Sequence, residues 1–307
     1  MLSNDLSDSG LSTQHSALRV HTALFTVATL FSLNYIVSKV AMISFSPLTF
    51  AYLRVVGAAI LLHVVPRDRT PIDRGDAWRL AGFAFLGVVI NQTLFLTGLS
   101  LTSAHSAAIF ITTIPVFTLA AAIALGREDA TARKIAGIAL AAVGALLVVG
   151  GEGFDGSPRA MLGSLMIVAN SLSYSLYLVL SKPMMLRLPA RRVVSRMFDI
   201  AAVAMMPIAI VPMMRQPWTA IPPRAWLGLL LVIAGPTVAA YLMNAWALRY
   251  ADSSVVAAYV YVQPVLATVL AAVFLGESLR PLIAVAALMI FAGVYLAGSK
   301  ETRNVER

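Results

Sequence analysis

Ten apolar stretches, each about as long as a bilayer is thick, limit what this chain can fold into. They cover approximately residues 20–41, 47–65, 77–99, 104–125, 132–150, 160–181, 193–214, 225–248, 253–275 and 281–298. A hydrocarbon core of ~30 Å needs roughly 20 apolar residues in a helix. Unpaired backbone polar groups are costly in lipid, and the alternating pattern of barrel strands is missing, so these stretches are expected to be helices. The sequence therefore predicts an all-α membrane protein with ten transmembrane helices.

The composition agrees with a membrane protein and disfavours several other classes. Hydrophobic residues make up 59% of the chain and charged residues 12%, whereas soluble chains average roughly 25% charged residues. The sequence has no cysteine, which excludes disulfides, thiolate metal sites and cysteine nucleophiles. A net charge of +9 would suggest a nucleic-acid partner in a soluble protein. In a membrane protein its meaning depends on where the basic residues lie relative to the bilayer.

The basic residues gather in every second connection. With the N-terminus in the cytoplasm, 17 of the 23 Lys and Arg residues fall in cytoplasmic segments and four on the opposite side, while Lys39 and Arg54 fall within spans. This positive-inside bias predicts that both termini are cytoplasmic. The expected location is a bacterial inner membrane. It also accounts for the net charge, so no nucleic-acid partner is expected. Residues 1–17 and 300–307 are polar and are expected to form cytoplasmic tails, the first of them disordered.

The two halves of the sequence resemble each other. A shift of 149 positions aligns Pro115 with Pro264, Glu128 with Glu277 and Gly144 with Gly293, and shifts of 143 and 142 align Lys39 with Lys182 and Arg54 with Arg196. Each half, 18–151 and 160–299, then holds five spans. Because five is odd, the second copy is expected to enter the membrane inverted. Inverted repeats are typical of secondary transporters, whose substrate sites lie near the midplane where the repeats meet.

Several segments resemble the EamA family of the drug/metabolite transporter superfamily. In the first half these are NYIVSK (34–39), FAYLR (50–54), LTSAHSAAIFITTIPVF (101–117) and GRE (126–128), and in the second half QPV (263–265) and LGE (275–277). The resemblance covers about residues 20–298. It implies ten helices in two tandem repeats and export of small metabolites. The arginine between Gly126 and Glu128 departs from the family pattern, in which glycine directly precedes glutamate.

Polar and aromatic residues within the apolar spans are the candidates for a substrate path. Asn170, Tyr174 and Tyr177 recur at helical spacing on one face, as do Tyr35 and Lys39. A polar stripe in lipid is expected to turn inward, towards a wet cavity or towards partner helices that it holds by hydrogen bonds. The sequence does not decide between these two roles. The full candidate set is Asn34, Tyr35, Lys39, Arg54, Asn91, Gln92, Asn170, Tyr174, Tyr177, Tyr241, Asn244, Trp246, Tyr259 and Gln263.

Two prolines and two ionisable residues carry further hypotheses. Pro115 and Pro264 correspond under the repeat and fall near the middle of their spans, where the carbonyls four residues earlier lose a partner. They are interpreted as paired hinges, although prolines are common in transmembrane helices. Proton coupling normally uses buried carboxylates or histidines, and Asp199 and His105 are the candidates. The mechanism is predicted to be either facilitated diffusion or proton antiport.

The function that follows is a secondary transporter of small organic metabolites, such as amino acids or drug-like amphipaths, working by alternating access and exporting its solute. A nucleotide-sugar or other phosphorylated-metabolite carrier is the alternative, with Lys39 and Arg54 binding the phosphate. No catalytic motif of a hydrolase, metalloprotease or P-loop enzyme occurs in the sequence, so the chain is not expected to be an enzyme. A purely structural or receptor-like helical bundle does not require an inverted repeat. The expected partners are a small solute and lipid; no cofactor or metal is expected, and a monomer can enclose a path.

Overall fold

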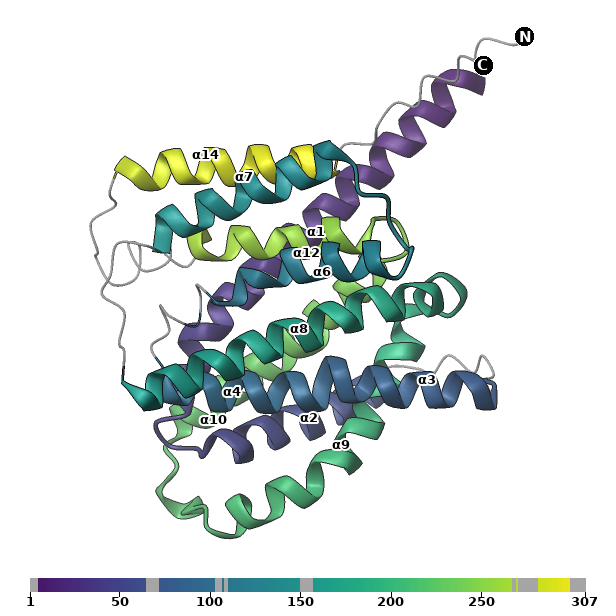
Figure 1. The fold of residues 1–307 in the computed structure, drawn as a ribbon. Helices are drawn as coiled ribbons and strands as arrows, with labels where there is room; N and C mark the ends of the chain where they lie inside the picture. The colour runs from purple at the N-terminus through teal and green to yellow at the C-terminus, as the bar shows by residue number, and fades with distance from the viewer. Residues whose placement is uncertain are drawn as a thin grey trace.

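The computed structural model describes residues 5–64, 72–102, 107, 110–149, 157–266, 269 and 281–298, and all the regular structure in these ranges is helical (Figure 1). The helices of the first half are α1 (Asp5–Ala41), α2 (Pro47–Val64), α3 (Arg74–Ala84), η1 (Phe85–Ile90), α4 (Asn91–Leu101), α6 (Thr113–Ala124) and α7 (Ala132–Val149). Those of the second half are α8 (Pro158–Arg187), α9 (Ala190–Met214), η2 (Trp218–Ala220), α10 (Pro223–Val232), η3 (Ile233–Ala239), α11 (Ala240–Ala247), α12 (Ser253–Ala258), η4 (Tyr259–Tyr261) and α14 (Pro281–Gly298).

Six of these helical segments are long and apolar enough to cross a membrane. They are Leu18–Ala41, Pro47–Val64, Arg74–Leu101, Pro158–Arg187, Ala190–Met214 and Pro223–Ala247. The described parts of the other four predicted spans contain α6, α7, α12 followed by η4, and α14. They include three shorter apolar segments, Thr113–Ala124, Ser253–Leu266 and Ala284–Ala297. The all-helical membrane fold predicted from the sequence is therefore present.

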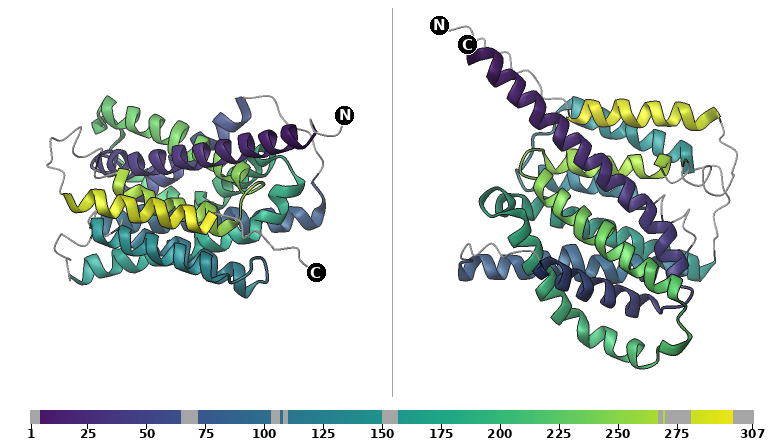
Figure 2. Two further views of the ribbon diagram at one scale, coloured as in Figure 1. Left: turned by 90° about the horizontal axis from the view of Figure 1, so that it is seen from above. Right: turned by 180° about the vertical axis from the view of Figure 1, so that it is seen from behind.

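The first helix is longer than the predicted span. It begins at Asp5, within the segment expected to be a tail, and its apolar part begins at Leu18. The N-terminal end of α1 projects beyond the other helices (Figure 2).

The ends of two other helices follow from the local sequence. At the start of α8, Ser157 accepts a hydrogen bond from the backbone of Ala160, and a proline lies in the first turn, a common N-terminal arrangement. Gly126 ends α6 with φ of 62°, which only glycine adopts freely.

Both third spans contain a π-helical turn at equivalent positions. In the first half it is η1, between α3 and α4, and in the second it is η3, between α10 and α11. A π turn leaves backbone carbonyls without their usual helical partner, and in a dry interior side chains must supply one. Ser173 donates to Leu86 O at 2.8 Å, Tyr241 to Gly87 O at 2.7 Å, and Thr237 to Val232 O at 2.7 Å. No pattern in the sequence predicted these turns.

A pseudo-twofold axis relates the two halves. The helices α7 and α14 lie side by side (Figures 1 and 2). A Cβ on Gly137 would meet Gly293 O at 2.7 Å, and one on Gly144 would meet Ala286 O at 2.8 Å. These contacts run in opposite directions along the two helices, and the shift of 149 positions exchanges one contact with the other. Such an exchange requires a twofold axis perpendicular to the helices, which is the internal relation expected of inverted repeats.

The connections fall into the two groups predicted from the basic residues. At one end, Asp76 pairs with Arg187 at 2.9 Å, and Lys182 pairs with Asp252 at 3.0 Å. At the other end, the backbone of Ser46 donates to Gln216 Oε1 at 3.0 Å. Connections predicted to share a side of the membrane therefore meet at one end of the bundle. Which end faces the cytoplasm stays a prediction.

Candidate functional site: a cavity between the two repeats

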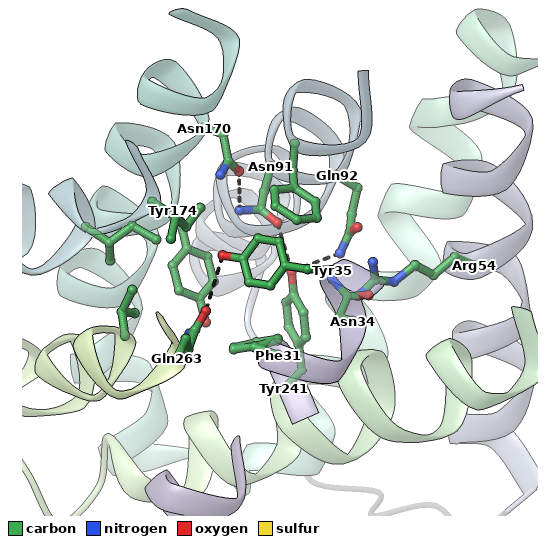
Figure 3. Close-up of a pocket in the computed structure, with 14 residues that line it drawn as sticks. Phe31, Asn34, Tyr35, Arg54, Asn91, Gln92, Asn170, Tyr174, Tyr241 and Gln263 are labelled. Carbon is green, nitrogen blue, oxygen red and sulfur yellow. Dashed lines mark hydrogen bonds between the residues drawn. The ribbon is translucent and has the colours of Figure 1, made fainter. Parts of the chain in front are cut away.

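A cavity lies where the two halves meet, and its wall mixes aromatic, amide and apolar side chains (Figure 3). It has about 60 Å³ of room for the centre of a water-sized molecule, which is enough for a few waters. A solute larger than this requires the helices to move apart. The lining residues are Phe31, Asn34, Tyr35, Arg54, Asn91, Gln92, Phe95, Ile111, Ile114, Asn170, Tyr174, Tyr241, Val260 and Gln263.

Nine of the predicted substrate-path residues therefore line one cavity, although they come from six predicted spans. Most of them are held by hydrogen bonds across the repeats. Asn91 donates to Asn170 Oδ1 at 2.6 Å, and Tyr35 donates to Gln263 Oε1 at 3.3 Å. These bonds fix the polar side chains in place, and such fixed groups give a binding site its selectivity.

Gln92 and Tyr241 lie on the pseudo-twofold axis. The two residues are 149 positions apart, and Gln92 Nε2 donates to the Tyr241 hydroxyl at 3.3 Å. The hydroxyl in turn donates to Gly87 O in the π turn η1, and it lies 3.2 Å from Asn91 Oδ1. Phe198 packs edge-on against the Tyr241 ring, with a centroid distance of 5.1 Å. Because this pair joins equivalent positions of the two halves, the cavity lies at the centre of the repeat symmetry.

Arg54 is the charged side chain among the cavity-lining residues. It is only 2% exposed, and its Nε donates to the Thr237 hydroxyl in the π turn η3. Nη1 is buried and has no hydrogen-bond partner in the described part of the chain. The guanidinium points into the same space as the amides of Asn34 and Gln92 (Figure 3). The cavity therefore contains one buried cation that is only partly satisfied.

Five predicted path residues lie outside the cavity lining. Lys39 is half-buried and donates to Leu99 O at 2.7 Å and Thr102 O at 2.9 Å, at the end of α4, where a cation is favourable. The other four contact neighbouring side chains. Tyr177 packs on Tyr174 with a centroid distance of 5.6 Å, Asn244 donates to the Tyr174 hydroxyl at 2.8 Å, Trp246 contacts Tyr250 with a centroid distance of 5.0 Å, and the Tyr259 hydroxyl lies 2.5 Å from His21 Nδ1.

Of the two candidates for proton coupling, Asp199 is described by the structure and does not line the cavity. Asp199 lies on α9 with a side chain 27% exposed, paired with Arg196 at 3.4 Å and near His63 at 3.5 Å. The sequence placed Asp199 within a span but could not show that its side chain lies outside the cavity lining. His105 lies outside the described residues.

The predicted hinge prolines stand beside breaks in their helices. The helix α6 begins at Thr113, so Pro115 lies in its first turn, where proline is well tolerated. In the second half, the 3₁₀ turn η4 interrupts the chain just before Pro264. The residues four positions before the prolines, Ile111 and Val260, both line the cavity. Each proline therefore lies one helical turn from the cavity wall.

The apolar part of the cavity wall was not predicted from the sequence. Phe31 and Phe95 belong to it, together with Ile111, Ile114 and Val260. Phe31 lies one helical turn before Tyr35, so it shares a face with a predicted residue, and this spacing is a signal that could have found it. In an apolar span such a pattern is weak, because most residues on every face are hydrophobic.

A cluster of charges closes one end of the bundle near the cavity-forming helices. Glu128, whose side chain is 3% exposed, accepts hydrogen bonds from the backbone and hydroxyl of Ser254 at the start of α12. Lys134 bridges Glu128 at 3.0 Å and Asp252 at 2.7 Å, and Lys182 also pairs with Asp252. Burial raises the pKa of the Asp252 carboxyl, but the hydrogen bonds and charges of the two lysines outweigh this and hold the pKa below its usual value.

The fold and the central cavity define a membrane transporter built from two repeats. The EamA-like transporter family model matches residues 18–150 and 161–299, and the chain belongs to this family. It is 26% identical over 287 residues to an "Uncharacterized transporter" of Archaeoglobus fulgidus, an alignment that covers 92% of this chain and 98% of the relative. It is also 26% identical to a "Probable amino-acid metabolite efflux pump" of Salmonella typhimurium, covering 88% of this chain and 91% of the relative.

A solved structure shares the fold. It superposes with a TM-score of 0.73 at 20% sequence identity, covering 92% of this chain and 96% of the other. Together with the family match, this similarity identifies the protein as a transporter of the EamA type.

Proposed function

We propose that this protein moves small organic metabolites, amino acids among them, out of the cell by alternating access across a bacterial inner membrane. In this proposal ten helices span the bilayer as two inverted repeats, and both termini are cytoplasmic. The observation that carries the proposal is the polar and aromatic cavity on the pseudo-twofold axis, because inverted-repeat transporters bind their solutes where the repeats meet. Because the cavity is small, the helices have to move apart to admit a solute.

Two further observations favour amino acids over phosphorylated metabolites. The relatives from Salmonella typhimurium and Escherichia coli carry the printed name "Probable amino-acid metabolite efflux pump", which supports export as the direction. A nucleotide-sugar carrier was expected to use Lys39 and Arg54 together, but Lys39 binds backbone carbonyls outside the cavity lining. The remaining single cation suits a solute with one negative charge.

Counterflow in liposomes tests the proposal. The full chain is reconstituted, loaded with unlabelled amino acids, cationic drugs or sugar nucleotides in separate preparations, and given the labelled solute outside. Uptake of amino acids above that of empty liposomes is the expected result. Uptake of sugar nucleotides alone contradicts the proposal and supports the alternative carrier. Repeating the measurement with and without an imposed proton gradient separates facilitated diffusion from antiport.

We also propose that Pro115 and Pro264 act as paired hinges, because each lies one turn from a cavity-lining residue. Substitution of either proline by alanine restores a backbone donor and is expected to slow counterflow several-fold while leaving solute affinity and membrane insertion intact. Pro212→Ala is the control, because Pro212 lies inside α9 and does not line the cavity. Wild-type flux in both Pro115→Ala and Pro264→Ala contradicts the hinge role.

A further inference from the structure

The guanidinium of Arg54 is an incomplete ion site. Its Nε is hydrogen-bonded to Thr237, and its Nη1 is buried without a partner among the described residues. None of the ion pairs found in the described part of the chain includes Arg54. The wall of the cavity that the guanidinium faces contains no Asp or Glu. Nothing in the described surroundings of Arg54 therefore neutralises its charge.

A buried cation of this kind is costly unless something compensates it. An unpaired charge inside a membrane protein is strongly unfavourable, so such residues are normally paired or line a water-filled path. A mobile anion that enters the cavity supplies the missing partner. The planar fork of arginine binds a carboxylate through two parallel hydrogen bonds, and the free Nη1 leaves one position of this fork open.

We propose that Arg54 is the residue that binds the carboxylate of a small organic monocarboxylate in this cavity. The inference rests on the proposed transport function and names the group by which the solute is recognised. The charge count favours a monoanion, because the cavity contributes one cation and a phosphomonoester carries nearly two negative charges. The small volume favours a compact acid over a nucleotide.

A second unsatisfied group lies in the same cavity wall. The amide oxygen of Gln92 is buried and has no hydrogen-bond partner among the described residues, while its nitrogen donates to Tyr241. An unsatisfied acceptor beside an unsatisfied cation complements a ligand with an N–H donor beside its carboxylate. The side chains of Gln92 and Arg54 extend toward the same region of the cavity (Figure 3). In this arrangement Arg54 binds the acid group and Gln92 binds the neighbouring N–H group of the solute.

Binding measurements on the purified full chain test this assignment. The probes are alanine, serine, leucine and phenylalanine, their carboxamides, and inorganic phosphate, each titrated by calorimetry or by the shift in melting temperature. We expect at least one acid to bind tenfold or more tightly than its carboxamide, because a hydrogen bond to a charged group is worth about one to two powers of ten in affinity. Equal affinity for acids and carboxamides, binding of phosphate alone, or binding of none of the acids overturns the assignment.

Two variants locate the effect at Arg54. In Arg54→Gln the affinity for the acid is expected to fall about ten- to hundredfold, while the affinity for the carboxamide is unchanged. In Arg54→Lys the affinity for the acid is expected to fall by a smaller factor, because lysine keeps the charge but not the planar fork. Arg196→Gln is the matched control, because Arg196 corresponds to Arg54 under the repeat but has a side chain 45% exposed outside the cavity lining. An equal loss of acid and carboxamide binding in Arg54→Gln indicates a structural role and contradicts the proposal. The comparison of acid with carboxamide in the wild-type chain needs no variant to fold.

The same solutes in liposomes separate this inference from the proposed function. If acids bind in an Arg54-dependent way but produce no counterflow, the transport proposal fails and the carboxylate site stands. If acids and carboxamides show equal counterflow, transport stands and the carboxylate site fails.

Discussion

The close approach of α7 and α14 at Gly137 allows an estimate of how far one added methyl group lowers the free energy of unfolding. A Cβ at this position would lie 2.6 Å from the backbone nitrogen of Ala297 and 2.7 Å from Gly293 O. Ordinary contacts begin at 3.4 Å, so the helices must separate locally by ~0.8 Å to relieve the contact at 2.6 Å. Backbone atoms cannot move aside as side chains do. Overpacking of this kind typically costs about 1–3 kcal/mol, partly offset by the ~0.5–1 kcal/mol that alanine gains over glycine inside a helix.

We therefore expect Gly137→Ala to lower the free energy of unfolding by about 1–2 kcal/mol. Gly82→Ala is the matched control, because Gly82 is exposed in α3 and a Cβ there meets nothing within 4 Å. The control is expected to be neutral or to stabilise the protein by up to ~1 kcal/mol. Thermal unfolding of both variants in the same detergent, followed by intrinsic fluorescence, measures the difference. If Gly137→Ala melts at or above the temperature of Gly82→Ala, the close contact between α7 and α14 is wrong.

Two further pairs of substitutions test the buried polar contacts. Glu128→Gln is expected to lower the free energy of unfolding by about 2–3 kcal/mol, because a buried ion pair with Lys134 is lost. Asp252→Asn is expected to lower it by less than ~1 kcal/mol, because the Asp252 side chain is 44% exposed. Equal melting temperatures of these two variants contradict this ranking. Tyr241→Phe removes a hydroxyl that donates to a π-turn carbonyl and is expected to lower the free energy of unfolding by about 1–3 kcal/mol. Tyr261→Phe removes a buried hydroxyl that has no partner among the described residues, and it is expected to be neutral or stabilising. Chemical unfolding of this second pair checks the order, and a larger loss in Tyr261→Phe refutes it.

The sequence predicted the helical fold and the repeat because both depend on patterns that repeat along the chain. Helical spacing also predicted most of the polar residues of the cavity wall, since polar residues such as Asn170 and Tyr174 must turn away from lipid. Periodicity identifies the face of a helix but not the depth of a residue along it. Tyr177 shares a face with these two residues, yet its ring packs against Gly87 of the neighbouring π turn instead of lining the cavity.

The sequence could not show which of the two cations, Lys39 or Arg54, lines the cavity. The contacts of each depend on where a neighbouring helix ends or changes its geometry. Lys39 and Arg54 look alike in the sequence, as single cations near the ends of adjacent spans. Lys39 binds backbone carbonyls because α4 ends at Leu101, within reach of its amine. Arg54 reaches the cavity because the π turn η3 presents Thr237 to its guanidinium. Neither the end of α4 nor the π turn was marked by a pattern in the sequence strong enough to predict it.

The cavity contains one cation, Arg54, although the repeat symmetry provides a second arginine at the equivalent position. A fully symmetric cavity would bring Arg196 inward opposite Arg54 and place two positive charges beside the axis. Instead, Arg196 is turned outward and pairs with Asp199 at 3.4 Å. A second unpaired cation would raise the cost of the empty cavity, because like charges in a low-dielectric interior repel strongly. One cation leaves the two halves of the cavity electrostatically different, so a solute with one charged end has one preferred orientation there.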